Sequence, residues 1–87
     1  MTARYKGRTS AKSIERENPY IVELAVPAGG FGKTMDVIVV FHANLGIPIL
    51  NGTGRYDEGQ YYVRFCFKDP QHLASFQALF GGEAVRG

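Results

Sequence analysis

The chain has 87 residues, of which 45% are hydrophobic and 13% aromatic, and its formal net charge is +2. This composition excludes a disordered chain and predicts one small globular domain, whose limited core would gain from burial against a second copy. One cysteine and two histidines offer no disulfide framework and few ligands for a metal site, so we expect no cofactor. No apolar run is long enough to span a membrane, and the N-terminus lacks the apolar region of a secretory signal. We therefore expect a cytoplasmic protein.

The positive charge lies mainly in residues 1–17, which carry five basic and two acidic side chains. This segment shows no periodicity and few apolar residues, so we expect a flexible basic arm with at most a helical turn after Ser13, followed by a single domain over residues 18–87. A basic arm is one way to reach nucleic acid or another acidic surface. The alternative is a solvated terminus with no such role.

The first regular element is a strand over residues 20–26. Its apolar side chains alternate with others at a period of two, which predicts a strand with one buried face. Pro27 has no amide proton to donate and therefore ends the pairing.

Residues 35–45 are ambiguous between a helix and a strand. The β-branched run over residues 37–40 favours a strand by propensity alone. A helix would place five residues on one face: Met35, Ile38, Val39, His42 and Leu45. Gly46 followed by Ile47 is also typical of a helix C-terminus. We predict a helix.

A glycine-rich connection precedes this helix and ends in Gly32, Lys33 and Thr34, the order found in nucleotide-binding loops. The first glycine of such a loop would fall on Pro27, and the chain is too short for the parallel sheet of a nucleotide-binding fold, so we do not predict nucleotide hydrolysis. Backbone amides at a helix N-terminus can bind an anion, which makes Gly30, Gly32, Lys33 and Thr34 a candidate anion site. The alternative is a tight turn with no ligand.

The second half of the chain predicts a hairpin and a helix. Residues 47–56 are expected to be extended, with bends at Gly52 and Gly54, and residues 57–59 form a hairpin connection. Residues 61–68 alternate as a strand with one buried face requires.

A helix is predicted directly after that strand. Asp69 and Pro70 are typical of the N-cap and the first helical position. Apolar residues then recur at helical spacing: Leu73, Phe76 and Phe80. Gly81 ends the helix, and residues 83–86 either add a short edge strand or trail into solvent.

The predicted order is strand, helix, strand, strand and helix, with or without a last short strand. Such an order resembles a ferredoxin-like split βαβ sandwich, in which both helices cover one face of an antiparallel sheet. The opposite, open face would carry Tyr62, Arg64, Cys66 and Lys68, and it must meet water, a ligand or another protein.

The stretch from Arg64 to Pro70, followed by Phe76 and by Phe80 with two glycines, resembles a group of small uncharacterised bacterial proteins in which a similar strand and helix close the chain. The glycine-rich connection and the residues around Gly46 look similar as well, so the resemblance covers roughly residues 19–86. It implies no activity, cofactor or catalytic residue.

Tyr62 beside Arg64 and Lys68 would suit the stacking of a base and the binding of a phosphate. The sequence around Tyr62 matches an RNA-recognition consensus in part, although Glu58 replaces a basic residue and Gln60 an aromatic one. The alternative is an ordinary amphipathic strand whose outer face packs on a partner chain.

Three side chains are candidates for catalysis. Cys66 lies between Arg64 and Lys68, and such neighbouring cations would lower the pKa of its thiol. His42 and His72 could each act as a general base. None of the three has a partner at a suitable spacing, so structural roles are favoured and we predict no enzyme.

We therefore predict a non-enzymatic binding or assembly module of unknown specificity. It would form a homodimer or bind a protein partner through Tyr62, Arg64, Cys66 and Lys68 on the open sheet face. The alternative is binding of nucleic acid, RNA in particular, through the same face and the basic arm.

Overall fold

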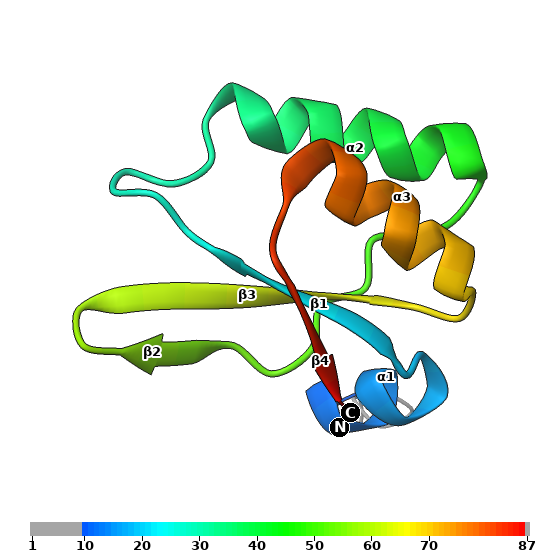
Figure 1. The fold of residues 1–87 in the computed structure, drawn as a ribbon, viewed down its shortest axis with the longest axis horizontal. Helices are drawn as coiled ribbons and strands as arrows, with labels where there is room; N and C mark the ends of the chain where they lie inside the picture. Colours follow the sequence, from blue (N-terminus) through cyan, green and yellow to red (C-terminus); the bar gives the residue numbers. More distant parts are fainter. Residues whose placement is uncertain (1–9, 87) are drawn as a thin grey trace, which may run out of the picture.

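The computed structural model describes residues 10–86, which form an antiparallel sheet flanked by helices (Figure 1). The strands are β1 (Tyr20–Ala25), β2 (Arg55–Asp57), β3 (Gln60–Phe67) and β4 (Glu83–Arg86). They pair in the order β2-β3-β1-β4. In the central pair, Val22 lies opposite Phe65 and Glu23 lies opposite Arg64. The α+β class and the antiparallel sheet are confirmed.

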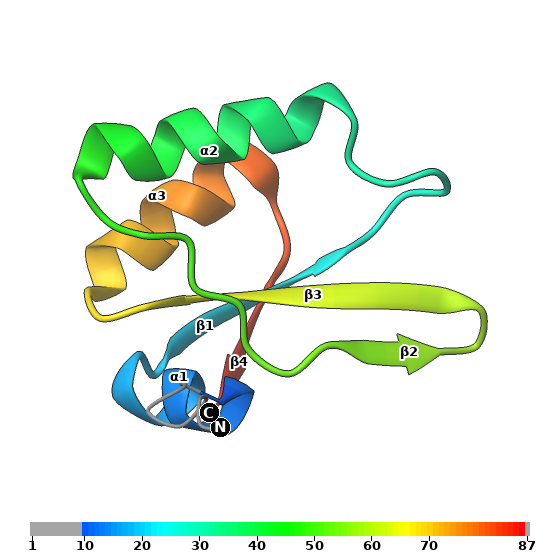
Figure 2. The ribbon, with the colours of Figure 1, turned by 180° about the vertical axis from the view of Figure 1, so that it is seen from behind.

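Helices α2 (Lys33–Leu45) and α3 (Pro70–Phe80) lie on one face of the sheet, and helix α1 (Ala11–Glu17) lies below the opposite face at one end (Figures 1 and 2). The helix predicted over residues 35–45 is confirmed, and the strand alternative is wrong. The β-branched run is accommodated in α2 because Ile38 of that run is fully buried against the sheet.

Local sequence determines where these two helices begin and end. The Asp69 side chain accepts a hydrogen bond from the Gln71 amide at 2.8 Å, and Pro70 follows it in the first turn of α3. At the end of α2, Gly46 has a left-handed backbone at φ 69°, and the Ile47 amide donates to the His42 carbonyl at 3.1 Å. Both caps agree with the sequence-based expectation.

A core rich in phenylalanine fills the space between the sheet and the two helices. Its buried residues are Val22, Leu24, Ile38, Phe65, Phe67 and Phe76. Phe41 of α2 contacts Phe76 and Phe80 of α3 in edge-on geometry, with ring centroids 5.6 and 5.9 Å apart. These aromatic contacts join the two helices to each other as well as to the sheet.

His42 belongs to this core. It is 2% exposed, and its ring stacks on that of Phe67 with centroids 5.6 Å apart. Nδ1 lies 2.9 Å from the Ile38 carbonyl and donates to it, while Nε2 has no hydrogen-bond partner among the described residues. A buried acceptor of this kind costs about 1–3 kcal/mol. The imidazole is enclosed in the core, with almost no contact with solvent.

Helix α1 departs from the expected flexible arm. The sequence predicts no regular structure through residue 17 beyond a turn after Ser13, whereas residues 11–17 are helical. Ser10 caps this helix by accepting a hydrogen bond from the Ser13 amide at 3.1 Å. The first nine residues of the expected arm lie outside the described residues.

Long-range contacts hold α1 against the rest of the domain. The carboxylate of Glu15 accepts a hydrogen bond from the Thr53 amide at 2.6 Å. Gly52 leaves room for this contact, because a Cβ at that position would collide with the Glu15 side chain and displace it. A helix of seven residues is unstable by itself, so these contacts explain why it forms.

Of the segment predicted to be extended over residues 47–56, only the last part pairs as a strand. Arg55–Asp57 forms β2, and Asn51 makes an isolated bridge with Phe65. The Cys66 amide donates to the Leu50 carbonyl at 2.9 Å. Residues 83–86 take the edge-strand alternative and pair with β1 as β4.

Candidate functional site

The four side chains predicted for the open sheet face do lie on the side of β3 that is opposite α2 and α3, because Phe65 and Phe67 occupy the helix-covered side. They do not form one exposed surface. Tyr62 and Arg64 are half-buried, Cys66 is 2% exposed, and Lys68 is exposed. The expectation of a bare face is therefore corrected: α1 and a set of ion pairs cover much of it.

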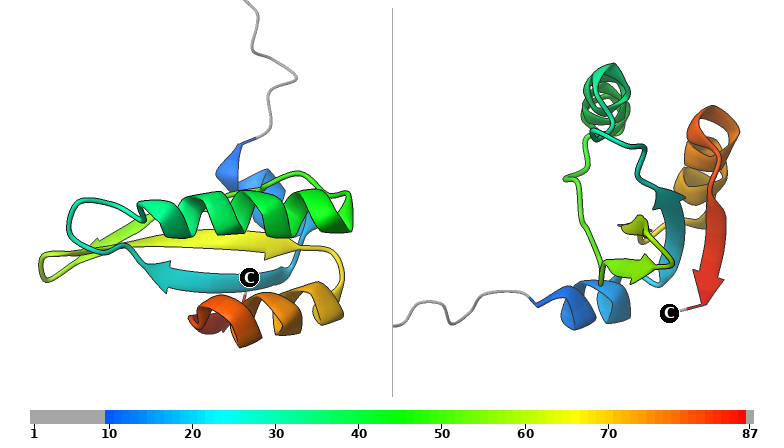
Figure 3. Two further views of the ribbon diagram at one scale, coloured as in Figure 1. Left: turned by 90° about the horizontal axis from the view of Figure 1, so that it is seen from above. Right: turned by 90° about the vertical axis from the view of Figure 1, so that its left-hand side faces the viewer.

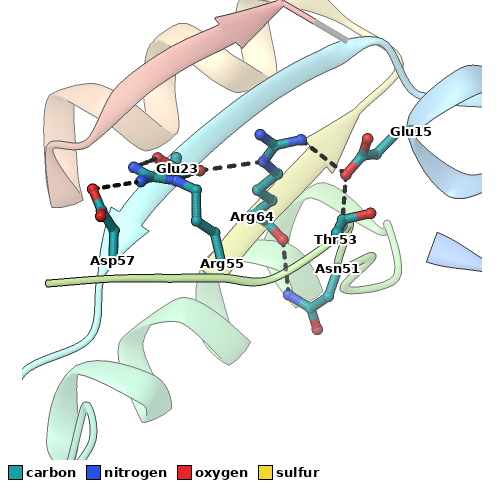
Figure 4. Close-up of polar contacts among 7 residues, drawn as sticks. All are labelled: Glu15, Glu23, Asn51, Thr53, Arg55, Asp57 and Arg64. Atoms are coloured by element: carbon teal, nitrogen blue, oxygen red, sulfur yellow. Dashed lines mark hydrogen bonds and ion pairs between the residues drawn. The ribbon is translucent and has the colours of Figure 1, made fainter. Parts of the chain in front are cut away.

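Arg64 lies at the centre of these ion pairs (Figure 4). Its Nη1 donates to Glu15 at 3.2 Å and its Nε donates to Glu23 at 3.3 Å. Glu23 also accepts a hydrogen bond from Nη2 of Arg55 at 2.7 Å, and Asp57 lies 3.4 Å from Nη1 of Arg55. Carboxylates therefore occupy the Arg64 guanidinium, which is not the free cation that the RNA hypothesis requires.

Tyr62 is covered in a similar way. Arg55 lies opposite Tyr62 in the β2–β3 ladder, and its guanidinium carbon is 4.1 Å from the centre of the Tyr62 ring. The ring face expected to stack a base is thus occupied by a side chain of the domain itself.

The ion pairs shift the pKa values of both glutamates downward. The hydrogen bond from Arg55 is the largest cause at Glu23, where it outweighs burial and lowers the pKa below 4.5. At Glu15 burial acts to raise the pKa, but hydrogen bonds from the Thr53 amide and from Arg64 overcome it and lower the pKa below 4.5. Both carboxylates are more stable as anions in the folded chain than in the unfolded chain.

These lowered pKa values predict an acid-sensitive stability. Because the folded-state values lie below 4.5, the contribution is fully present above that pH and is lost as the pH falls through the folded-state values. We expect each carboxylate to contribute about 0.5–1 kcal/mol to the free energy of unfolding. Urea unfolding at a series of pH values measures this. Glu23→Gln should flatten the fall, whereas Glu58→Gln, on the exposed hairpin, should not; equal slopes in the two variants would contradict the prediction.

Cys66 is not an activated thiol. Burial is the largest cause at this residue and raises the pKa of the thiol to about 11, and the nearby Glu15 carboxylate acts in the same direction. Arg64 acts to lower the pKa of the thiol, but burial and Glu15 outweigh it. The sequence-based expectation of a lowered pKa is wrong because it counted the neighbouring cations and missed both the burial and Glu15.

A pocket of about 380 Å³ opens beside Cys66. It lies where α1, the segment after α2, the end of β3 and the start of α3 meet. Its apolar lining consists of Ile14, Ile47, Pro48, Leu50 and Phe67. Its polar lining consists of Glu17, Asn18, Lys68, Asp69 and His72. Of the four residues predicted for the open face, Cys66 and Lys68 line this pocket, while Tyr62 lies further back along β3 under Arg55.

His72, the second candidate general base, lies at the rim of this pocket. Its Nε2 lies 3.9 Å from the Asp69 carboxylate, too far for a hydrogen bond. The two histidines do not meet, since His42 is enclosed in the core. Within residues 10–86, no group of three or more histidine, cysteine, aspartate or glutamate side chains could hold a metal ion.

The candidate anion site lies at the start of α2. Gly30 and Gly32 have positive φ values of 93° and 57°, as the tight strand-to-helix turn requires. The Thr34 amide donates to the Phe31 carbonyl at 3.1 Å, so it is already used within the turn. Lys33 is exposed at the first position of the helix. Anion binding by Gly30, Gly32, Lys33 and Thr34 stays a prediction.

The outer side of α2 carries a second feature, which was not expected from the sequence. Val37 and Val40 are 52% and 54% exposed. Val39, which the sequence placed on one face with the buried Ile38 and His42, lies at the edge of that face and is 47% exposed. Within residues 10–86, no other element covers this side of the helix (Figure 3). The signal was available in the sequence, since residues 37–45 contain no aspartate, glutamate, lysine or arginine. Surface helices normally carry charge on their outer face.

Comparison of the chain with protein-family models, with curated proteins and with solved structures finds no match. None of the helices in residues 10–86 combines the length and the hydropathy that crossing a membrane requires.

Proposed function

We propose that this domain is a cytoplasmic, non-enzymatic assembly module that forms a homodimer through the outer side of α2. The observation that carries the proposal is the pair of half-exposed valines Val37 and Val40, three residues apart on a stretch of helix without aspartate, glutamate, lysine or arginine. The proposal keeps the class of function expected from the sequence and moves the contact surface from the sheet face to the helix face. The sheet face is less suitable because Arg64 is already paired and Cys66 is buried.

Helix energetics support an interface on α2. Valine has a lower helix propensity than alanine, leucine, lysine or glutamate, because its branched side chain loses freedom against the preceding turn. On a solvent-facing side of a helix, Val37 and Val40 gain little burial that could offset this loss. About half of each side chain is already covered, so burial of the rest against another surface would supply about 0.8–1.5 kcal/mol for each valine.

The pattern of residues on α2 fits a second copy of the same helix. Val40 lies on the outer side, with Asp36 and Asn44 four residues away in either direction. An antiparallel pairing of two α2 helices about a twofold axis at Val40 sets Asp36 of each copy beside Asn44 of the other. A carboxylate then meets an amide, no like charges face each other, and the surface is complementary to itself.

The dimer is tested by measuring the mass in solution with light scattering after size-exclusion chromatography. We expect the wild type to have twice the mass of one chain, and Val40→Asp to be a folded monomer. Tyr62→Glu is the matched variant on the sheet face and should remain a dimer. A dimer that is lost in Tyr62→Glu and kept in Val40→Asp would place the contact on the sheet face, and a monomeric wild type at millimolar concentration would reject self-association.

The order of elements supports a finer assignment of the fold. After α1, the chain runs through strand, helix, strand, strand, helix and strand, and the sheet order is β2-β3-β1-β4. We propose that this part of the chain is a ferredoxin-like split βαβ sandwich to which α1 is added.

Nucleic-acid binding remains the alternative, although Arg64 is paired with carboxylates and Arg55 covers the Tyr62 ring. Lys68 is exposed, and the basic residues before residue 10 lie outside the described part of the chain. Binding of a fluorescent RNA oligomer that weakens with added salt, and that is reduced in Lys68→Gln, would support it. An absence of binding at low salt would reject it.

A further inference from the structure

We propose that the pocket beside Cys66 binds a small amphipathic zwitterion, of the kind represented by an α-amino acid with an apolar side chain. The apolar body would lie on the floor of the pocket, the carboxylate would meet Lys68, and the ammonium group would meet Glu17. This site is independent of the α2 surface, since no α2 residue lines it.

The size and the floor of the pocket suit a small apolar body. Its volume of about 380 Å³ is near the lower end of the ~300–1,000 Å³ typical of ligand pockets, which suits a molecule of amino-acid size. Leu50, Phe67 and Ile14 give it apolar walls. Cys66 adds no charge, because burial raises the pKa of its thiol to about 11 and keeps it protonated at neutral pH.

The lining of the pocket carries one lysine, Lys68, and two carboxylates, Glu17 and Asp69. Lys68 and Glu17 are both exposed, and neither takes part in an ion pair within residues 10–86. Asp69 is partly committed, since its carboxylate accepts the Gln71 amide at the start of α3. A ligand with only a carboxylate would give Glu17 no ion-pair partner, and a ligand with only an amine would give Lys68 none.

The two helix ends that border the pocket have the same polarity as these charges. α3 begins beside Lys68, and the N-terminus of a helix favours an anion. α1 ends beside Glu17, and the C-terminus of a helix favours a cation. Asn18 is 5% exposed, and its side-chain amide is held in place by a hydrogen bond from Nδ2 to the Ile14 carbonyl at 2.9 Å. Asn18 also lines the pocket, and its amide oxygen is a further acceptor for an ammonium group.

Three probes with the same phenyl ring separate the contributions. L-phenylalanine carries both charges, 3-phenylpropanoate only the carboxylate, and 2-phenylethylamine only the ammonium. In an NMR titration of the full chain, L-phenylalanine should give saturable shifts at the amides of Leu50, Cys66, Lys68 and His72. Each singly charged probe should bind about twofold to fivefold more weakly. A singly charged probe that binds as tightly as L-phenylalanine, or an absence of saturable shifts with all three, would overturn the proposal.

Charge-removing variants assign the two ends of the ligand. Lys68→Gln should weaken the binding of L-phenylalanine and of 3-phenylpropanoate about twofold to fivefold and leave that of 2-phenylethylamine unchanged. Glu17→Gln should weaken the binding of L-phenylalanine and of 2-phenylethylamine by a similar factor and leave that of 3-phenylpropanoate unchanged. Lys12→Gln and Glu58→Gln are the matched controls, because both residues are exposed and neither lines the pocket. Unchanged binding of L-phenylalanine in both Lys68→Gln and Glu17→Gln would reject the assignment.

Discussion

Replacing Phe76 with alanine is expected to lower the free energy of unfolding by about 3–5 kcal/mol. The Phe76 ring is fully buried, and it meets aromatic rings from β3, α2 and α3. Its centroid lies 5.0 Å from that of Phe65 and 4.6 Å from that of Phe80. Removing the ring leaves a cavity where the sheet and both helices meet, and the expected loss is a substantial part of the ~5–15 kcal/mol typical of a whole domain.

Urea unfolding followed by circular dichroism measures this change. Leu79→Ala is the matched control on the same helix, because Leu79 is 66% exposed and its truncation should change the free energy of unfolding by about 0.5 kcal/mol or less. Similar losses in the two variants would mean that Phe76 does not occupy the centre of the core.

Replacing Gly82 with alanine is expected to cost about 2–4 kcal/mol. Gly82 has φ 92°, a conformation that alanine adopts only with strain. A Cβ there would also lie 2.8 Å from the Glu23 carbonyl oxygen and 2.8 Å from Cγ2 of Val22. Two costs therefore add, because neither the central strand nor the buried valine can move away freely.

Gly81→Ala separates the two costs. Gly81 has φ 80°, but a Cβ at this position would have no neighbouring atom within 4 Å, so alanine there meets strain without a clash. We expect it to lose about 1–2 kcal/mol, less than Gly82→Ala, by thermal and urea unfolding. Equal losses would show that the contact with β1 is unimportant.

The elements that could be predicted from the sequence are those whose stability follows from nearby residues. The strand β3 and the helix α3 show their own periods, and Asp69 and Pro70 cap α3 through contacts within two residues. The end of α2 at Gly46 also depends only on nearby residues, since the Gly46 amide donates to carbonyls within the last turn of the helix. In each case the pattern and the physical cause lie within one short window of the chain.

What could not be predicted depends on residues far apart in the chain. α1 has only Ile14 as a large apolar side chain, and its Glu15 is paired with Arg64, 49 residues away. Arg55 reaches Tyr62 and Glu23 only because of the register of three strands. The burial of Cys66 also depends on distant residues. With two helices on one face of the sheet, the other face would be open and Cys66 exposed, but here the third helix, α1, lies below that face.

The contacts of Glu15 make one cooperative unit out of three separate segments. Its carboxylate joins α1, the loop at Thr53 and the middle of β3 through Arg64. When that carboxylate is protonated, the first helix and the loop lose their attachment together, while the aromatic core on the other face keeps its packing. Amide hydrogens of the helix and of the loop should then exchange with solvent at a common rate, ahead of the central strands.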